Sequence, residues 1–120
     1  MLTVLAIDDS RTIREMLRET LSGAGFDVHV AVDGIDGLEK LRELTPNVII
    51  TDINMPRLDG FGVIEAIRSG PSRSSLPILV LTTESAPDLK ERARKCGATG
   101  WIVKPFDDAR LISAIRRITA

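Results

Sequence analysis

NVIITD, at residues 47–52, is a run of strand-forming residues that ends in a charged side chain, Asp52. The first apolar run of the chain, TVLAI at residues 3–7, ends in the same way, in Asp8 and Asp9. Such runs are typical of buried parallel strands, and ligands bind at the carboxyl edge of parallel sheets. Three carboxylates at one edge are too costly to serve as packing. We therefore expect them to hold a cation and to present one aspartate for chemistry.

The composition is that of an ordinary globular chain, and it excludes several classes of function. The 120 residues suit one domain spanning residues 1–120, and they carry a formal net charge of -1, which provides no basic surface for nucleic acid. No stretch is apolar enough for membrane insertion, and the N-terminus lacks the layout of a signal peptide, so we expect a cytoplasmic protein. The single cysteine, Cys96, excludes an internal disulfide and a CxxC-type zinc site.

Strand-like and helix-like segments alternate along the chain. Strands are expected at residues 3–7, 26–31, 47–51, 76–81 and 99–103, the second at a sheet edge because one of its faces is polar. Helices are expected from Asp9 or Ser10 to Gly23, from Asp33 to before Pro46, around Phe61–Ile67, from Pro87 to Lys95 and from Asp107 to Thr119. Residues 69–75 read as an internal loop.

Five such units with short connections predict an α/β fold of the flavodoxin-like type. This fold is a (βα)5 three-layer sandwich around a parallel five-stranded sheet in the order 2-1-3-4-5. Its switch point lies between the first and third strands, which carry Asp8, Asp9 and Asp52. The acidic residues therefore belong to the part of the fold where ligands bind.

Two more strand ends carry polar side chains. The fourth strand leads into Thr82, Thr83 and Glu84, and the fifth leads into Lys104 and Pro105. Carboxylate oxygens suit Mg²⁺, which uses one or two carboxylates and keeps several waters. A lysine and a hydroxyl group beside a metal provide charge neutralisation and hydrogen bonds for a phosphoryl group. The pattern therefore predicts a site for phosphoryl chemistry.

These residues, in this order, resemble the receiver domains of bacterial two-component response regulators, and in particular the CheY-like single-domain regulators of chemotaxis. The resemblance covers the whole chain, from Asp8 through Asp52 and Thr82 to Lys104. It implies a phosphoprotein without an output domain, in which Asp52 accepts a phosphoryl group from a CheA-like sensor histidine kinase. Such a protein is not an enzyme in the usual sense, since it catalyses only its own phosphorylation and dephosphorylation.

The same resemblance implies a Mg²⁺ site in which Mn²⁺ can substitute. Asp9 and Asp52 would be direct ligands, and the backbone carbonyl of Asn54 would be the third ligand that the protein supplies. Asp8 would act through water. Lys104 would pair with the phosphoryl oxygens. The bond between Lys104 and Pro105 is cis in relatives, which places the lysine in a tight turn.

The resemblance also implies a switch, in which Thr82 closes onto the phosphoryl group and Trp101 turns into the vacated space. This would remodel the face made by the fourth helix, the fifth strand and the fifth helix. Trp101 stands where relatives have Tyr or Phe, so its orientation stays open. Thr83 stands where they have a small residue, which predicts slower exchange with small phosphodonors. Asn54 and Glu84 match residues that influence hydrolysis.

The resemblance implies a monomer that binds a flagellar motor switch protein or a phosphatase, and a stand-alone receiver in a non-motility phosphorelay is the alternative. Two other classes compete with this interpretation. A haloacid-dehalogenase-type phosphatase needs Asp-x-Asp after the first strand, where this chain has Asp8-Asp9-Ser10. A flavodoxin needs a hydroxyl- and glycine-rich loop at the same place, where the two acidic side chains would repel the FMN phosphate.

Overall fold

A computed structural model describes residues 1–70 and 75–120 of the protein. Strands and helices alternate along it. The elements are β1 (Thr3–Ile7), α1 (Arg11–Gly23), β2 (Asp27–Ala31), α2 (Gly34–Lys40), β3 (Val48–Thr51), α3 (Gly60–Arg68), β4 (Ile78–Thr82), α4 (Pro87–Cys96), β5 (Gly100–Val103) and α5 (Asp108–Ile118). No helix in these ranges is long and apolar enough to cross a membrane.

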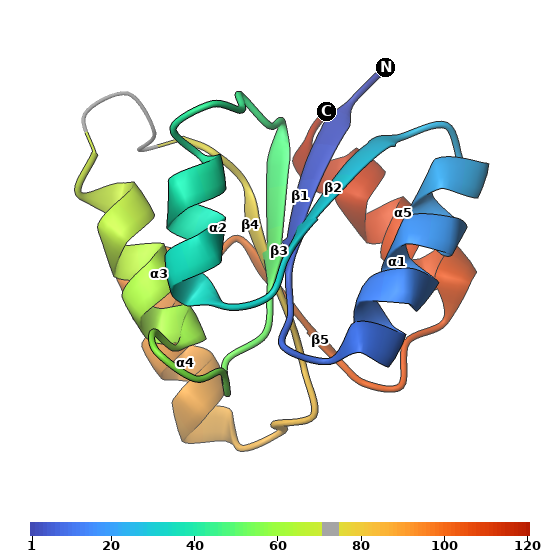
Figure 1. Ribbon diagram of the computed structural model, residues 1–120. Coiled ribbons are helices and arrows are strands. Elements are labelled where there is room, and N and C mark those ends of the chain that lie inside the picture. Colours follow the sequence, from blue (N-terminus) through green and yellow to red (C-terminus); the bar gives the residue numbers. More distant parts are fainter. Residues whose placement is uncertain (71–74) are drawn as a thin grey trace.

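The five strands form one parallel sheet in the order β2-β1-β3-β4-β5. Helices α1 and α5 cover one face, and α2, α3 and α4 cover the other, which gives the three layers seen in Figure 1. The predicted flavodoxin-like fold and strand order are therefore confirmed. Because every strand runs in the same direction, all five carboxyl ends lie along a single edge of the sheet.

The burial of each strand follows its place in the sheet. Every residue of the central strands β3 and β4 is buried, which explains their almost continuous apolar sequences. Strand β2 lies at an edge, as predicted, and most of its residues are only partly buried or exposed. Strand β5 forms the opposite edge and is also partly exposed.

Each face of the sheet carries its own half of the core. On one face α1 contributes Leu17 and Leu21, and α5 contributes Leu111 and Ile115, none of them more than 1% exposed. The other half is built from α3 residues such as Phe61, Ile64 and Ile67, together with apolar side chains of α2 and α4. Ile13 and Ile118 lie at the margin of the first half as partly buried residues.

Short polar residues start four of the helices. Side chains of Ser10, Asp33, Asp59 and Asp107 accept hydrogen bonds from the first turns of α1, α2, α3 and α5. Of the two caps considered for α1, Ser10 is the one observed. Helix α4 has no side-chain cap; it begins with Pro87, as predicted, and ends at Gly97, whose φ of 114° suits glycine.

The observed bounds differ from the expected ones mainly at α2. This helix ends at Lys40, well before Pro46, because the N–H groups of Arg42 and Glu43 bond to carbonyls three residues back rather than four. The second strand starts at Asp27 instead of Phe26. Of the loop expected at residues 69–75, residues 71–74 lie outside the described part of the chain.

Candidate functional site

The acidic residues lie at adjacent strand ends. In the β1–β3 pair Ile7 is opposite Thr51, so the next residues, Asp8 and Asp52, come side by side at the carboxyl edge. Backbone hydrogen bonds extend the pairing to these positions: the Asp8 N–H donates to the Ala31 carbonyl at 3.1 Å and the Asp52 N–H donates to the Ile7 carbonyl at 3.0 Å. The sheet itself therefore fixes the spacing of the two carboxylates.

Lys104 joins the two carboxylates. It follows β5, and its Nζ donates to Asp8 Oδ2 at 2.8 Å and to Asp52 Oδ2 at 2.9 Å. All three side chains are nearly buried, with exposed fractions of 9% for Lys104, 2% for Asp8 and 11% for Asp52. The Lys104–Pro105 peptide bond is cis, as expected from the resemblance. The lysine predicted to serve the site thus lies in its centre.

The electrostatics of this cluster reflect burial and pairing. Burial raises the pKa of Asp8 above its usual range, although the hydrogen bonds from Lys104 and from the Ser10 N–H oppose the shift. For Lys104, burial alone would lower the pKa, but the hydrogen bonds and negative charges of Asp8 and Asp52 outweigh it and the pKa is raised. The ammonium group is therefore firmly charged at neutral pH.

Asp9 completes an acidic cluster with the donor set of a metal site. One carboxylate oxygen from each of Asp8, Asp9 and Asp52 lies within 4.8 Å of the others. Asp9 is exposed, and in residues 1–70 and 75–120 its side chain has no hydrogen bond or ion pair. Clustered carboxylates with one free member fit Mg²⁺, which takes oxygen ligands and retains water. The structure thus brings together the three predicted acidic residues.

A chain of hydrogen bonds connects the predicted switch residues through Glu84. The Glu84 N–H donates to Thr82 Oγ1 at 3.3 Å, its carboxylate accepts from Asn54 Nδ2 at 2.7 Å, and its carbonyl accepts from Trp101 Nε1 at 3.2 Å. Thr82 is fully buried, whereas Thr83 beside it is exposed. Glu84 therefore contacts the loop after Asp52, the strand β4 and the strand β5 at once.

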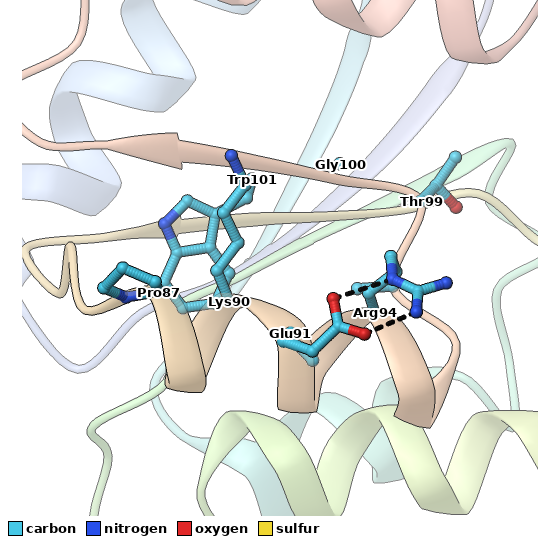
Figure 2. Close-up of a pocket in the computed structure, with 9 residues that line it drawn as sticks. Pro87, Lys90, Glu91, Arg94, Thr99, Gly100 and Trp101 are labelled. Carbon is cyan, nitrogen blue, oxygen red and sulfur yellow. Dashed lines mark hydrogen bonds and ion pairs between the residues drawn. The ribbon is translucent and has the colours of Figure 1, made fainter.

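The Trp101 side chain extends from β5 toward α4, and this settles the orientation that the sequence left open. Its ring is half-buried against the core, and it lines a cleft of about 250 Å³ together with α4 residues such as Pro87 and Lys90. Figure 2 shows the indole beside the start of α4, with the Glu91–Arg94 ion pair further along the helix. The side chain is thus neither fully inward nor fully outward.

Sequence reasoning assigned no role to Arg57 or to the Asp33 carboxylate beyond opening α2. In the structure Arg57 Nε donates to Asp33 Oδ2 at 2.7 Å and an Arg57 Nη donates to Oδ1 at 3.0 Å. These residues are 24 positions apart, and no motif connects them. The available signal was the place of Asp33 after β2, the one strand end at which no site residue was predicted.

Comparisons with known proteins agree with this geometry. A family model of the response regulator receiver domain matches residues 4–116. The crystal structure of the Vibrio cholerae chemotaxis protein CheY4 is 43% identical, with a TM-score of 0.94 and 98% of each chain covered. Protein PilG of Pseudomonas aeruginosa is 37% identical over 96% of this chain and 85% of its own. Response regulator MprA of Mycobacterium leprae is 38% identical, and this chain spans half of its length.

Proposed function

Because this chain belongs to the family of response regulator receiver domains, we propose that Asp52 accepts a phosphoryl group from a sensor histidine kinase. Receiver domains are signalling phosphoacceptors, so the question is which residue accepts. The observation that carries the choice is the position of Lys104, whose ammonium group touches Asp52 and Asp8 at the carboxyl edge; of these two side chains Asp52 is the more accessible, at 11% exposed against 2% for Asp8. A phosphoryl group on Asp52 would meet this cation, whereas Asp9 is exposed and has no cation within reach among the described contacts.

The transfer follows from these contacts. An oxygen of the Asp52 carboxylate attacks the phosphorus of a phosphohistidine, the P–N bond breaks, and the imidazole leaves with the electron pair and takes up a proton. Lys104 then binds the oxygens of the new acyl phosphate, while the Ile53 N–H, now 2.6 Å from Asp52 Oδ1, helps to fix the carboxyl group. Mg²⁺ held by Asp9, Asp52 and the Asn54 carbonyl, with Asp8 through water, would neutralise phosphoryl charge, and Mn²⁺ could substitute.

The switch that we propose starts at Thr82. Its hydroxyl oxygen accepts the Glu84 N–H in the present state, and a phosphoryl group on Asp52 offers a stronger acceptor for the hydroxyl proton. Movement of Thr82 would disturb Glu84 and with it the bond from Trp101, so that the face of α4, β5 and α5 changes. Asn54, Glu84 and the exposed Thr83 would then control how water and small phosphodonors reach the acyl phosphate.

Chemotaxis is the role we propose for this switch. The support is the likeness to the Vibrio cholerae chemotaxis protein CheY4 along nearly the whole of both chains. A flagellar motor switch protein or a phosphatase would bind the face of α4, β5 and α5. Capture of the motor switch protein by the chain plus Mg²⁺ and beryllofluoride, but not by the untreated chain, would support this role. Equal capture by both would favour a non-motility phosphorelay.

Incubation with acetyl phosphate and Mg²⁺, followed by intact-mass measurement, tests the proposed acceptor. Wild type should gain the mass of one phosphoryl group, and hydroxylamine should remove it because acyl phosphates are labile to this nucleophile. Asp52→Asn should gain nothing, while Asp27→Asn, on the exposed edge strand β2, should behave as wild type. Full labelling of Asp52→Asn would refute the assignment.

A further inference from the structure

Arg57 has an unusual backbone conformation. Among the described residues it is the one non-glycine residue with positive φ, at 67°. The left-handed region costs a side-chain-bearing residue about 1 kcal/mol or more, and glycine would avoid that cost. Such strain persists where surrounding contacts outweigh it. The contacts of the Arg57 side chain should therefore explain why arginine is kept at this position.

Those contacts are with Asp33, which lies beyond the end of β2. Two N–H groups of Arg57 donate to the two Asp33 oxygens, at 2.7 and 3.0 Å, in the paired geometry that only arginine provides. Asp33 is 5% exposed, and its Oδ1 also accepts the Asp36 N–H at 2.8 Å, which caps α2. The carboxylate thus holds the loop after β3 and the start of α2 at the same time.

The loop between β3 and α3, residues 53–59, is also packed closely at both ends. A Cβ atom on Gly34, at the start of α2, would lie 2.4 Å from the Leu58 carbonyl oxygen. The start of the loop is held by the first residue of α3: the Gly60 N–H donates to the Ile53 carbonyl at 2.8 Å, and a Cβ on Gly60 would lie 2.2 Å from the Asp52 carbonyl oxygen. Movement of the loop at Arg57 would therefore be transmitted to the backbone around Asp52.

We propose that Arg57 is a positioning residue for phosphoryl transfer, and that its ion pair with Asp33 fixes the loop that presents Asn54 to the acidic cluster. The inference rests on the proposed function. Four strand ends supply the site residues themselves. The residue beyond β2, Asp33, forms with Arg57 the ion pair that holds the loop, called the brace below. Loss of the brace lets Asn54 move away from Asp52, so Mg²⁺ binds more weakly and phosphorylation needs more Mg²⁺.

Two variants separate the ion pair from its side effects. Arg57→Gly removes the guanidinium and leaves Asp33 without its cation, but glycine adopts a φ of 67° freely, which offsets part of the lost stability; a thermal melt checks that the variant is folded at the assay temperature. Asp33→Asn keeps a side chain that caps helices well but loses the charge and one acceptor oxygen. Lys40→Ala is the matched control, because it removes the Lys40–Asp36 ion pair of the same helix and leaves Arg57 untouched.

Calorimetric titration with MgCl2, without any phosphodonor, gives the dissociation constant directly. Outer partners of metal ligands usually matter by 10–100-fold, and a brace one step further out should matter by about three- to tenfold. We expect that increase for Arg57→Gly and for Asp33→Asn, no further increase for the double variant, and wild-type binding for Lys40→Ala. The Mg²⁺ concentration that half-saturates phosphorylation by acetyl phosphate should shift by the same factor.

The outcomes distinguish failure of the brace from failure of the proposed function. If both ion-pair variants bind Mg²⁺ as wild type does, or if Lys40→Ala loses as much affinity as they do, Arg57 has no positioning role and only this inference is overturned. If wild-type protein is not phosphorylated on Asp52, the proposed function fails and the inference falls with it. Additive losses in the double variant would also overturn the brace, since two halves of one ion pair cannot act independently.

Discussion

At the scale of single residues, Lys104 determines how two buried carboxylates can lie next to each other at the ends of β1 and β3. Asp8 and Asp52 each accept a hydrogen bond from its ammonium group, at 2.8 and 2.9 Å. A buried ion pair contributes little net stability, but removal of one partner leaves a charge without compensation. The lysine is therefore more important to the fold than its place in a short turn would indicate.

Lys104→Met should destabilise the protein by about 3–5 kcal/mol at pH 7, because two nearly buried carboxylates lose their shared cation. Without the hydrogen bond from Lys104, nothing from that residue opposes the rise that burial causes in the pKa of Asp8, so the variant should recover stability as pH falls and Asp8 takes up a proton. Urea unfolding of wild type and variant at pH 7 and at pH 5 measures both effects. An equal deficit at the two pH values would contradict the explanation.

The wild-type protein should also lose stability in alkali through Lys104. Its pKa is raised in the folded state, so the stabilisation is complete below the ordinary lysine value of about 10.5 and disappears as pH rises through the higher folded value. Lys104→Met lacks this group and should show a smaller loss between pH 9 and the alkaline limit of folding. Thermal melts at several pH values across that range measure this, and melting temperatures that fall equally with pH in the two proteins would contradict the role of Lys104.

The sequence predicted single residues well where a strand end places them. Asp8, Asp9, Asp52 and Lys104 were expected at one edge from the apolar runs alone, and the structure brings them together. The contact between Arg57 and Asp33 could not be predicted in that way. It depends on the path of an irregular loop and on a left-handed backbone angle, and neither has a periodic signal in the sequence.

At the scale of elements, the join between β3 and α3 holds the acceptor residue in place. Helix α3 begins at Gly60, whose N–H bonds back to Ile53 while its Cα packs against the Asp52 backbone. Asp59 caps the helix from the preceding position. Because glycine allows this close approach, the first turn of α3 supports the strand end directly.

Gly60→Ala should therefore cost about 1–3 kcal/mol, since its Cβ would lie 2.2 Å from the Asp52 carbonyl oxygen and the backbone would have to move. It should also slow phosphorylation by acetyl phosphate. Gly23→Ala is the matched control: it lies in α1 with nothing within 4 Å of the added Cβ, and it should gain about 0.5–1 kcal/mol. Urea unfolding compares the two, and equal effects would refute the role of close packing at Gly60.

Most element types were predictable because the apolar pattern of the strand or helix matches its burial, whereas α4, with Ala93 as its one buried residue, was predicted from Pro87 at its start. The central strands read as continuous apolar runs and are buried throughout. The end of α2 was not predictable, since the turn at Arg42 and Glu43 depends on hydrogen bonds to carbonyls three residues back, and Leu41 stays buried beyond the helix. The orientation of Trp101 was open for a similar reason: it depends on the carbonyl of Glu84 in a loop.

At the scale of the whole molecule, the sheet gathers like charges that only a bound cation would compensate fully. Lys104 forms ion pairs with Asp8 and Asp52, and the exposed Asp9 has no partner among the described residues. The parallel order of the strands dictates this arrangement, so it could be predicted once the fold class was known. The fold should therefore be less stable without metal than its core would allow.

In EDTA the free energy of unfolding of Asp9→Ala should exceed that of wild type by about 1 kcal/mol, because an exposed like charge is removed from the cluster. The variant should therefore melt at a higher temperature. Mg²⁺ at ten times its dissociation constant should stabilise wild type by about 1.4 kcal/mol through binding to the folded state, and the variant should gain little. Four thermal melts, each protein with EDTA and with Mg²⁺, make the comparison. A variant that melts lower in EDTA and gains as much from Mg²⁺ would show that Asp9 is no ligand.

The identity of the phosphorylated residue is the central claim, and borohydride trapping measures it directly. The protein is incubated with acetyl phosphate and Mg²⁺, treated with sodium borohydride, which reduces an aspartyl phosphate to homoserine, and digested for peptide mass spectrometry. We predict conversion of Asp52 alone, in proportion to the phosphoryl group seen by intact mass, because Lys104 contacts its carboxylate and because Asp8, which shares the lysine, is less exposed, at 2% against 11%. Conversion of Asp8 or Asp9 with Asp52 unchanged would contradict this account of the site.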